Sequence, residues 1–122
     1  TDSVFSAIIK NDGAFIFPSF DLTVECNDNK AKLVFTSSED SFILKNVSLP
    51  VCIRSRQAGD CIAASSGRMK SVSDILSDWH VCSRLKNSVP IVQDLSCPEQ
   101  ELIAIVASIF GFENWIVKGK VC

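Results

Sequence analysis

The chain has 122 residues, of which 47% are hydrophobic and 21% are charged. This length fits a single domain over residues 1–122, and the apolar content excludes a disordered tail. No apolar run reaches the roughly 18 residues that a membrane-spanning helix needs, and no signal-peptide pattern is visible. We therefore expect a cytoplasmic domain without membrane contact. Because the chain opens at Thr1 rather than Met, we also expect it to be cut from a longer protein.

The first part of the chain, residues 1–50, is predicted to be rich in strands. Residues 14–26 are mostly apolar or β-branched, and Leu22, Val24 and Cys26 alternate with polar neighbours. This alternation is typical of a strand with one buried face. The elements that follow are a turn at 27–30, a strand at 31–36, a turn at 37–40 and a strand at 41–44.

The rest of the chain adds helices. Ser71 and Asp74 stand at the two ends of a capping box, and an apolar stripe of a short helix follows at Val72, Ile75, Leu76 and Trp79. A second helical segment begins near Ser83 and ends at Pro90. Residues 102–112 fit either a helix or a strand. Strands are predicted at 51–56, 91–94 and 115–117. The fold class is therefore α+β, with a largely antiparallel sheet and two or three short helices.

Positive charge is concentrated in the middle of the chain. The whole chain carries a net charge of −2. By counting Lys and Arg against Asp and Glu, residues 1–51 carry −3, residues 52–86 carry +3 and residues 87–122 carry −2. The overall charge argues against a nonspecific nucleic-acid binder, whereas the middle segment allows a local basic patch.

Two arginines stand close together in this basic segment. If residues 51–56 form a strand, Val51 and Ile53 point to the core, and Arg54 and Arg56 share the opposite, exposed face. A tight turn at Gly59 and Asp60 follows. Guanidinium groups match phosphate oxygens and stay charged at physiological pH, so the pair suits phosphate recognition. The alternative is that both arginines only keep a sheet face solvated.

The order of motifs from Arg54 onward helps to distinguish this arginine pair from an ordinary solvated surface. Arg-x-Arg-x-x-Gly-Asp is followed by a glycine with basic residues at 67–70, by a short helix that contains Asp74, and by Pro90. Over about residues 51–117, this order resembles the C-terminal domain of bacterial tRNA(Ile)-lysidine synthetases. In that family the order is Arg-x-Arg-x-x-Gly-Asp, Gly-x-x-Lys-Lys, an Asp in a short helix and Pro-x-x-x-Arg-Asp-x-x-Pro.

The resemblance assigns roles to individual positions. The positions that it implies for RNA binding are Arg54, Arg56, Arg68, Lys70 and Lys86. The positions that match structural parts of the motifs are Gly59, Asp60, Asp74 and Pro90. The chain departs from the family pattern where Ser71 stands for a lysine, Cys82 for a proline, Lys86 for an arginine and Asn87 for an aspartate, and the hairpin after Asp94 lacks its usual glycine. Because Ser71 removes one basic residue of the pattern and Lys86 softens another, the resemblance predicts weaker RNA contact, or contact shifted to Arg68 and Arg84.

The resemblance also implies a parent enzyme. Such enzymes use ATP and magnesium to attach lysine to the wobble cytidine of tRNA(Ile), in an N-terminal domain with a Ser-Gly-Gly-x-Asp-Ser loop. No such loop occurs in this sequence, and a backbone cradle for ATP phosphates needs those glycines. We therefore expect no cofactor in this chain and no ligase activity from it alone. The expected partners are tRNA(Ile), the catalytic domain of the same chain and, through the parent, a second copy.

A different class of function stays open from the sequence. The chain would then be a non-catalytic structural or dimerisation module whose basic face is merely solvated. The salt dependence of tRNA binding separates the two, because a structural module has no tRNA affinity for salt to weaken.

Other chemical groups give weaker signals. The six cysteines lack the close pairing of a zinc site, so free thiols and no bound metal are expected, although three disulfides would suit a secreted protein. His80 is a poor candidate for acid–base catalysis, because it follows Trp79 at a helix end. A set of phenylalanines could serve for base stacking, but core packing is the favoured interpretation for Phe15, Phe17, Phe20, Phe35 and Phe42.

Overall fold

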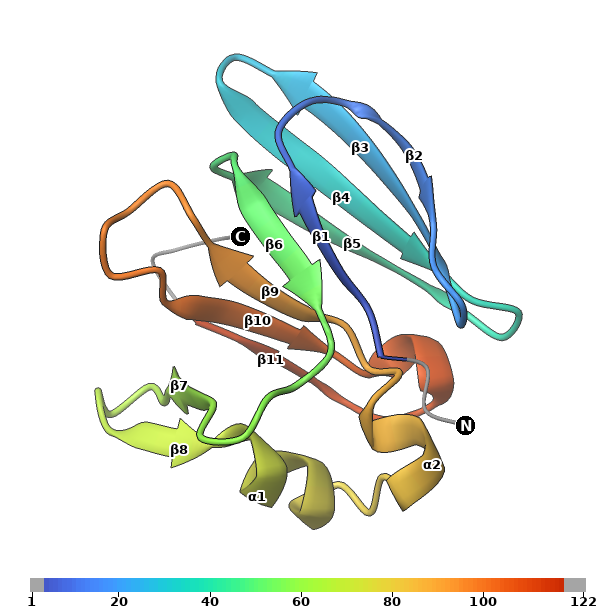
Figure 1. Cartoon of the computed structure of the whole chain (residues 1–122), viewed down its shortest axis with the longest axis vertical. Coiled ribbons are helices and arrows are strands. Elements are labelled where there is room, and N and C mark those ends of the chain that lie inside the picture. The colour runs from blue at the N-terminus through green and yellow to red at the C-terminus, as the bar shows by residue number, and fades with distance from the viewer. Residues whose placement is uncertain (1–3, 118–122) are drawn as a thin grey trace.

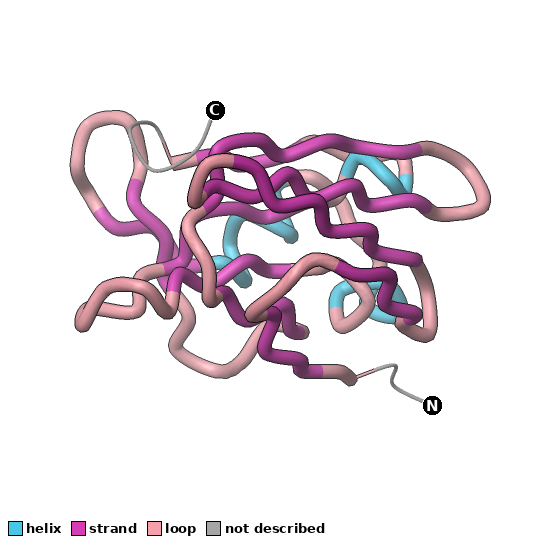
Figure 2. The backbone as a smooth tube through the Cα atoms, turned by 90° about the horizontal axis from the view of Figure 1, so that it is seen from above, coloured by secondary structure: helices cyan, strands magenta, loops and turns pink. Residues whose placement is uncertain are grey.

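The computed structural model of the chain describes residues 4–117. These residues form two β-sheets and a layer of short helices (Figure 1). Figure 2 shows that strands and loops make up most of the chain and that the helices are short. The predicted α+β class with a largely antiparallel sheet is confirmed. Within the described part, no helix is long and apolar enough to cross a membrane.

The smaller sheet consists of four consecutive antiparallel strands. They are β2 (Gly13–Ile16), β3 (Asp21–Asn27), β4 (Lys30–Thr36) and β5 (Ser41–Val47). The turn between β3 and β4 places Asp28 and Asn29 at positive φ, which short polar side chains tolerate best. The segment 14–26 was predicted as one strand. It is divided instead, because a turn in which the Phe17 amide donates to the Phe20 carbonyl separates β2 from β3.

The larger sheet has seven strands. Its strand order is β1-β6-β9-β10-β7-β8, and β11 also pairs with β10. The strands are β1 (Ser6–Ile9), β6 (Val51–Arg54), β7 (Cys61–Ala63), β8 (Met69–Ser71), β9 (Ile91–Asp94), β10 (Leu102–Val106) and β11 (Asn114–Ile116). The pairs are antiparallel except for β7 with β10. Because β1 pairs with β6, the first part of the chain contributes to the same sheet as the motif region.

Two hydrophobic cores lie on opposite faces of the larger sheet. The first core joins it to the smaller sheet and contains Leu33, Phe35 and Ile53. The second joins it to the helices and contains Ile75, Leu76 and Ile91. In Figure 1 the larger sheet accordingly lies between the smaller sheet and the helices. The central strands β6, β9 and β10 are therefore covered on both faces, which explains their nearly continuous apolar sequences.

The helical layer follows the larger sheet's β7–β8 hairpin. Helix α1 (Val72–Asp78) begins after Ser71, whose side chain accepts a hydrogen bond from the Asp74 amide at 3.4 Å, so the predicted cap is confirmed. Helix α2 (Ser83–Lys86) lies where the second helix was predicted. Residues 102–112 combine strand β10 with a 3-10 helix, η1 (Ser108–Phe110), which resolves the ambiguity in that segment.

Candidate nucleic-acid interface

Arg54 does not lie on an exposed face, and the sequence-based placement of this side chain was wrong. The residue is only 5% exposed at the end of β6. Its guanidinium donates to both carboxylate oxygens of Asp60, over 2.8 and 3.0 Å, and its Nε donates to Gln93. The prediction failed because it assumed one wet sheet face, whereas β6 is buried on both sides.

The Arg54–Asp60 pair closes the loop that carries the second arginine. Asp60 also accepts from the backbone amide of Gln57 at 2.6 Å, and Gly59 makes the turn at a φ of 85°. The Arg54–Asp60 contacts and the bonds between Asp60 and the Gln57 backbone thus fix both ends of the loop. In this structure Arg54, Gly59 and Asp60 hold the loop in shape, while Arg56 lies within it.

Arg56 lies outside β6 and is half-buried between the loop and both helices. Its Nε donates to the Asn87 side-chain oxygen at 3.2 Å, and its Nη1 donates to the Ser73 hydroxyl at 3.2 Å. Asn87 is held in turn, because its backbone carbonyl accepts from the Ser55 hydroxyl at 2.6 Å. Both partners of Arg56 are neutral, so its positive charge has no compensating carboxylate among these contacts.

Lys86, the last residue of α2, contacts the same helix as Arg56, namely α1. Its ammonium donates to the Ser77 hydroxyl at 3.1 Å. Ser73 and Ser77 are four residues apart on α1, and such positions lie about 5–6 Å apart on one face of a helix. Arg56 and Lys86 are therefore held by neighbouring turns of α1 and present two positive charges side by side. A pocket of about 310 Å³ borders Arg56, Gln57, Ala58, Ser73 and Asn87.

The other predicted cations lie on and near the β7–β8 hairpin. Lys70 forms an ion pair with Asp78 at 2.9 Å, and both side chains are largely exposed. Arg68 is exposed in the hairpin turn, and no partner for its side chain is found among residues 4–117. Arg84, on α2, is likewise exposed without a partner in that range. The structure thus separates the five predicted RNA-binding residues into a buried framework residue, Arg54, a helix-bound pair and a hairpin pair.

We refer to Arg56, Arg68, Lys70, Arg84 and Lys86 as the basic set. They all come from the loop after β6, the β7–β8 hairpin and helix α2, which adjoin α1 on the side of the molecule opposite the smaller sheet (Figure 1). Asp74 and Asp78 on α1 are the exposed acids within this region. Pro90 is buried just before β9, where its carbonyl accepts from the Val106 amide at 3.0 Å.

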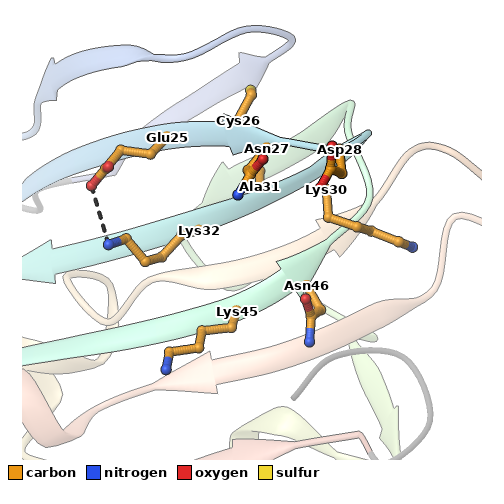
Figure 3. Close-up of a pocket in the computed structure, with 9 residues that line it drawn as sticks. All are labelled: Glu25, Cys26, Asn27, Asp28, Lys30, Ala31, Lys32, Lys45 and Asn46. Atoms are coloured by element: carbon orange, nitrogen blue, oxygen red, sulfur yellow. Dashed lines mark ion pairs between the residues drawn. The ribbon is translucent and has the colours of Figure 1, made fainter.

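A pocket on the smaller sheet is less suited to anion binding. It has a volume of about 480 Å³ and is lined by Glu25, Cys26, Asn27, Asp28, Lys30, Ala31, Lys32, Lys45 and Asn46. In Figure 3, Lys30 points away from the side on which Lys32 and Lys45 lie. Lys32 is paired with Glu25 at 3.3 Å. The positive groups do not converge here, so this pocket serves as a comparison surface rather than a site.

The remaining chemical candidates contribute little to a site. His80 is exposed just after α1 with a φ of 61°. Among residues 4–117, no group of three or more His, Cys, Asp or Glu side chains is arranged to hold a metal ion. The phenylalanines named above all belong to, or pack against, the first core, so the core-packing interpretation is confirmed. Sequence reasoning missed Ser73 and Ser77 as partners of the cations, because exposed helix serines carry no pattern of their own.

Comparison with known proteins supplies one relative. The chain is 37% identical over 70 residues to the tRNA(Ile)-lysidine synthase of Treponema denticola. The matching stretch is 57% of this chain and 14% of that enzyme, so the chain spans about a seventh of its relative's length. No family model and no solved structure matches the chain.

Proposed function

We propose that this chain is a tRNA-contacting domain of a tRNA(Ile)-lysidine synthase. The observation that carries the proposal is the 37% identity over 70 residues to such an enzyme. The domain would grip the body of tRNA(Ile), while the ATP- and magnesium-dependent attachment of lysine would take place in another part of a longer enzyme. The short coverage of the relative is consistent with this division, because 14% of its length corresponds to one domain.

The basic set supports RNA contact in physical terms. Arg56 and Lys86 are oriented by neutral hydroxyl and amide groups, which fix their positions without cancelling their charges. A guanidinium has five N–H donors, of which Arg56 uses two in these contacts. The remaining donors border an open pocket and are suited to a phosphate oxygen. Such contacts position a nucleic acid without reading its sequence.

Asn87 has a specific part in this proposal. The resembled family has an aspartate at this position, which would pair with Arg56 and reduce its charge. The neutral Asn87 amide keeps the hydrogen bond but leaves the guanidinium uncompensated. We infer that this departure strengthens the anion-binding capacity of Arg56, and that it offsets part of the loss expected from Ser71 and Lys86.

The second candidate is a purely structural module. The buried Arg54–Asp60 pair and the contacts from Arg56 to two elements favour it, since they hold the loop and helices together. In that case the exposed cations only solvate the surface. The two candidates predict opposite results for the same binding experiment.

The test is equilibrium binding of a tRNA(Ile) transcript to the chain over a range of salt concentrations. Each phosphate contact contributes about 0.9 to the slope of log affinity against log salt for duplex nucleic acid. Arg56→Ala combined with Lys86→Ala should therefore weaken binding and lower the slope by roughly 1.8. The matched control is Lys32→Ala with Lys45→Ala on the smaller sheet, which should change neither quantity.

Asn87→Asp gives a second test without removing a contact. The aspartate keeps an acceptor for Arg56 and adds a negative charge beside it. We expect weaker tRNA binding together with unchanged or slightly increased stability. The structural module would be supported if the unaltered chain does not bind tRNA detectably at low salt. It would also be supported if Arg56→Ala with Lys86→Ala and Asn87→Asp both leave tRNA binding unchanged.

A further inference from the structure

A groove lies between the β7–β8 hairpin and β11, away from the Arg56 pocket. Its volume is about 500 Å³. One wall consists of the small residues Ala63, Ala64, Ser65 and Gly67, and the other consists of Asn114, Trp115, Ile116 and Val117. The small side chains leave room beside the only large aromatic group of the lining.

The indole of Trp115 is held in a fixed orientation. Trp115 lies in β11 opposite Ile105 of β10 and is half-buried. Its Nε1 donates to the Ala63 carbonyl at 2.9 Å, which joins β11 to the hairpin. The donor of the indole is thus satisfied inside the protein, and its aromatic surface borders the groove. An aromatic group fixed in this way loses little conformational entropy when a flat ligand packs against it.

One cation lies at this aromatic group, and a second follows a residue that lines the groove. The Lys70 ammonium lies 6.0 Å from the centre of the Trp115 ring. Arg68 follows Gly67 in the hairpin turn and is exposed, and its side chain has no partner among residues 4–117. The Lys70–Asp78 ion pair is largely exposed, and pairs of this kind contribute little stability, so Lys70 can exchange Asp78 for another anion.

We propose that this groove binds an unpaired nucleotide of RNA, with its base packed on Trp115 and its phosphate bound by Arg68 and Lys70. A fixed aromatic surface beside basic side chains is the combination that recognises single-stranded nucleic acid. Bases inside a duplex are stacked on one another and cannot reach such a groove. The inference rests on the proposed tRNA-contacting function and adds a contact of a different kind from the phosphate contacts of Arg56 and Lys86.

Tryptophan fluorescence can report on this groove directly. The chain has two tryptophans, and Trp79 at the end of α1 is not part of the groove. In the Trp79→Phe variant, Trp115 is the sole emitter. Single-stranded oligoadenylate should quench this emission saturably, and a blunt RNA duplex should quench it far less. In the matched Trp115→Phe variant, the emission of Trp79 should stay unchanged with either RNA.

Filling the groove gives a test that keeps Trp115 in place. Ser65 lines the groove, whereas its exposed neighbour Ser66 does not. Ser65→Phe should weaken oligoadenylate binding by about five- to a hundred-fold, the range expected for the loss of one base–aromatic stack. Ser66→Phe places the same side chain one residue further along the turn and should have no such effect.

The outcomes separate this inference from the proposed function. If the chain binds tRNA(Ile) with the expected salt dependence, but oligoadenylate leaves Trp115 emission unchanged, the groove is not a nucleotide site and the proposed function stands. Equal quenching by duplex and single strand, or equal effects of Ser65→Phe and Ser66→Phe, also overturns the groove. If neither tRNA(Ile) nor oligoadenylate binds, both the proposed function and the nucleotide site in the groove are wrong.

Discussion

Arg54→Ala removes one partner of the buried ion pair that closes the Arg56 loop. The Arg54 side chain is 7% exposed and that of Asp60 is 12% exposed, so the remaining carboxylate would be left largely out of water. Arg54 also donates to Gln93 and to the Ser55 carbonyl, at 3.2 and 3.0 Å. All of these contacts disappear together, and within the described residues 4–117 no other cation is in contact with Asp60 to replace them.

The magnitude follows from the cost of an unpaired buried charge. Removing one member of a buried pair typically costs about 3–5 kcal/mol of unfolding free energy. Asp60 keeps its hydrogen bond from the Gln57 amide, so we expect the lower end, about 3 kcal/mol. For a domain of this size, that loss corresponds to a fall of roughly 10 °C in Tm. Domain stabilities are about 5–15 kcal/mol, so the variant should still fold in the cold.

Urea unfolding followed by circular dichroism measures this loss, and a double-mutant cycle isolates the pair. Asp60→Ala alone should also destabilise the chain, while the combination with Arg54→Ala should cost clearly less than the two single losses added. Arg56→Ala is the matched control, because Arg56 is half-buried with neutral partners and should cost about 1 kcal/mol. An unfolding free energy of the Arg54→Ala variant within about 0.5 kcal/mol of that of the unaltered chain would show that the pair is not a buried structural contact.

Three further predictions concern other parts of the molecule. Ser71→Ala should destabilise the chain by about 1 kcal/mol in urea unfolding, because it removes the cap of α1, and Ser66→Ala should not. The chain alone should not incorporate labelled lysine into tRNA(Ile), since its sequence lacks the phosphate loop of the resembled enzymes; detectable incorporation would contradict the proposed division of labour. Thiol titration of the denatured chain under non-reducing conditions should find about six free thiols, as many as the sequence has cysteines, and two or fewer would indicate disulfides. In the native chain, Cys52 should be the slowest to react of the five cysteines within residues 4–117, because it is buried. Cys26, Cys61 and Cys82 are exposed and should react first.

The predictions from local sequence patterns were the most reliable. The Ser71 cap and the two short helices follow from spacing within a few residues, and local hydrogen bonds determine them in the structure. Strands β1, β7 and β8 were not predicted. They are only three or four residues long, and pairing with distant strands stabilises them more than any pattern of their own.

The site itself was predicted only in part. The sequence pointed to the basic segment 52–86, which does contain the candidate site. The prediction, however, took alternate residues of β6 to face water, and β6 is covered on both faces. Arg54 therefore became a framework residue, and Arg56 lies beyond the strand. Trp115 was predicted only as part of a closing strand. Its contact with Ala63 arises because β7 and β11 both pair with β10, and no local sequence pattern reveals this long-range pairing.

The two-sided burial of β6, β9 and β10 has a consequence for how the sequence can change over evolution. A residue in these strands has close neighbours above and below, so a larger or smaller side chain cannot be accommodated by moving toward water. The outer face of the smaller sheet has no such constraint, and Ile16 there is 88% exposed. Substitutions should therefore accumulate on that outer face, whereas the three central strands should change only through compensating pairs of substitutions.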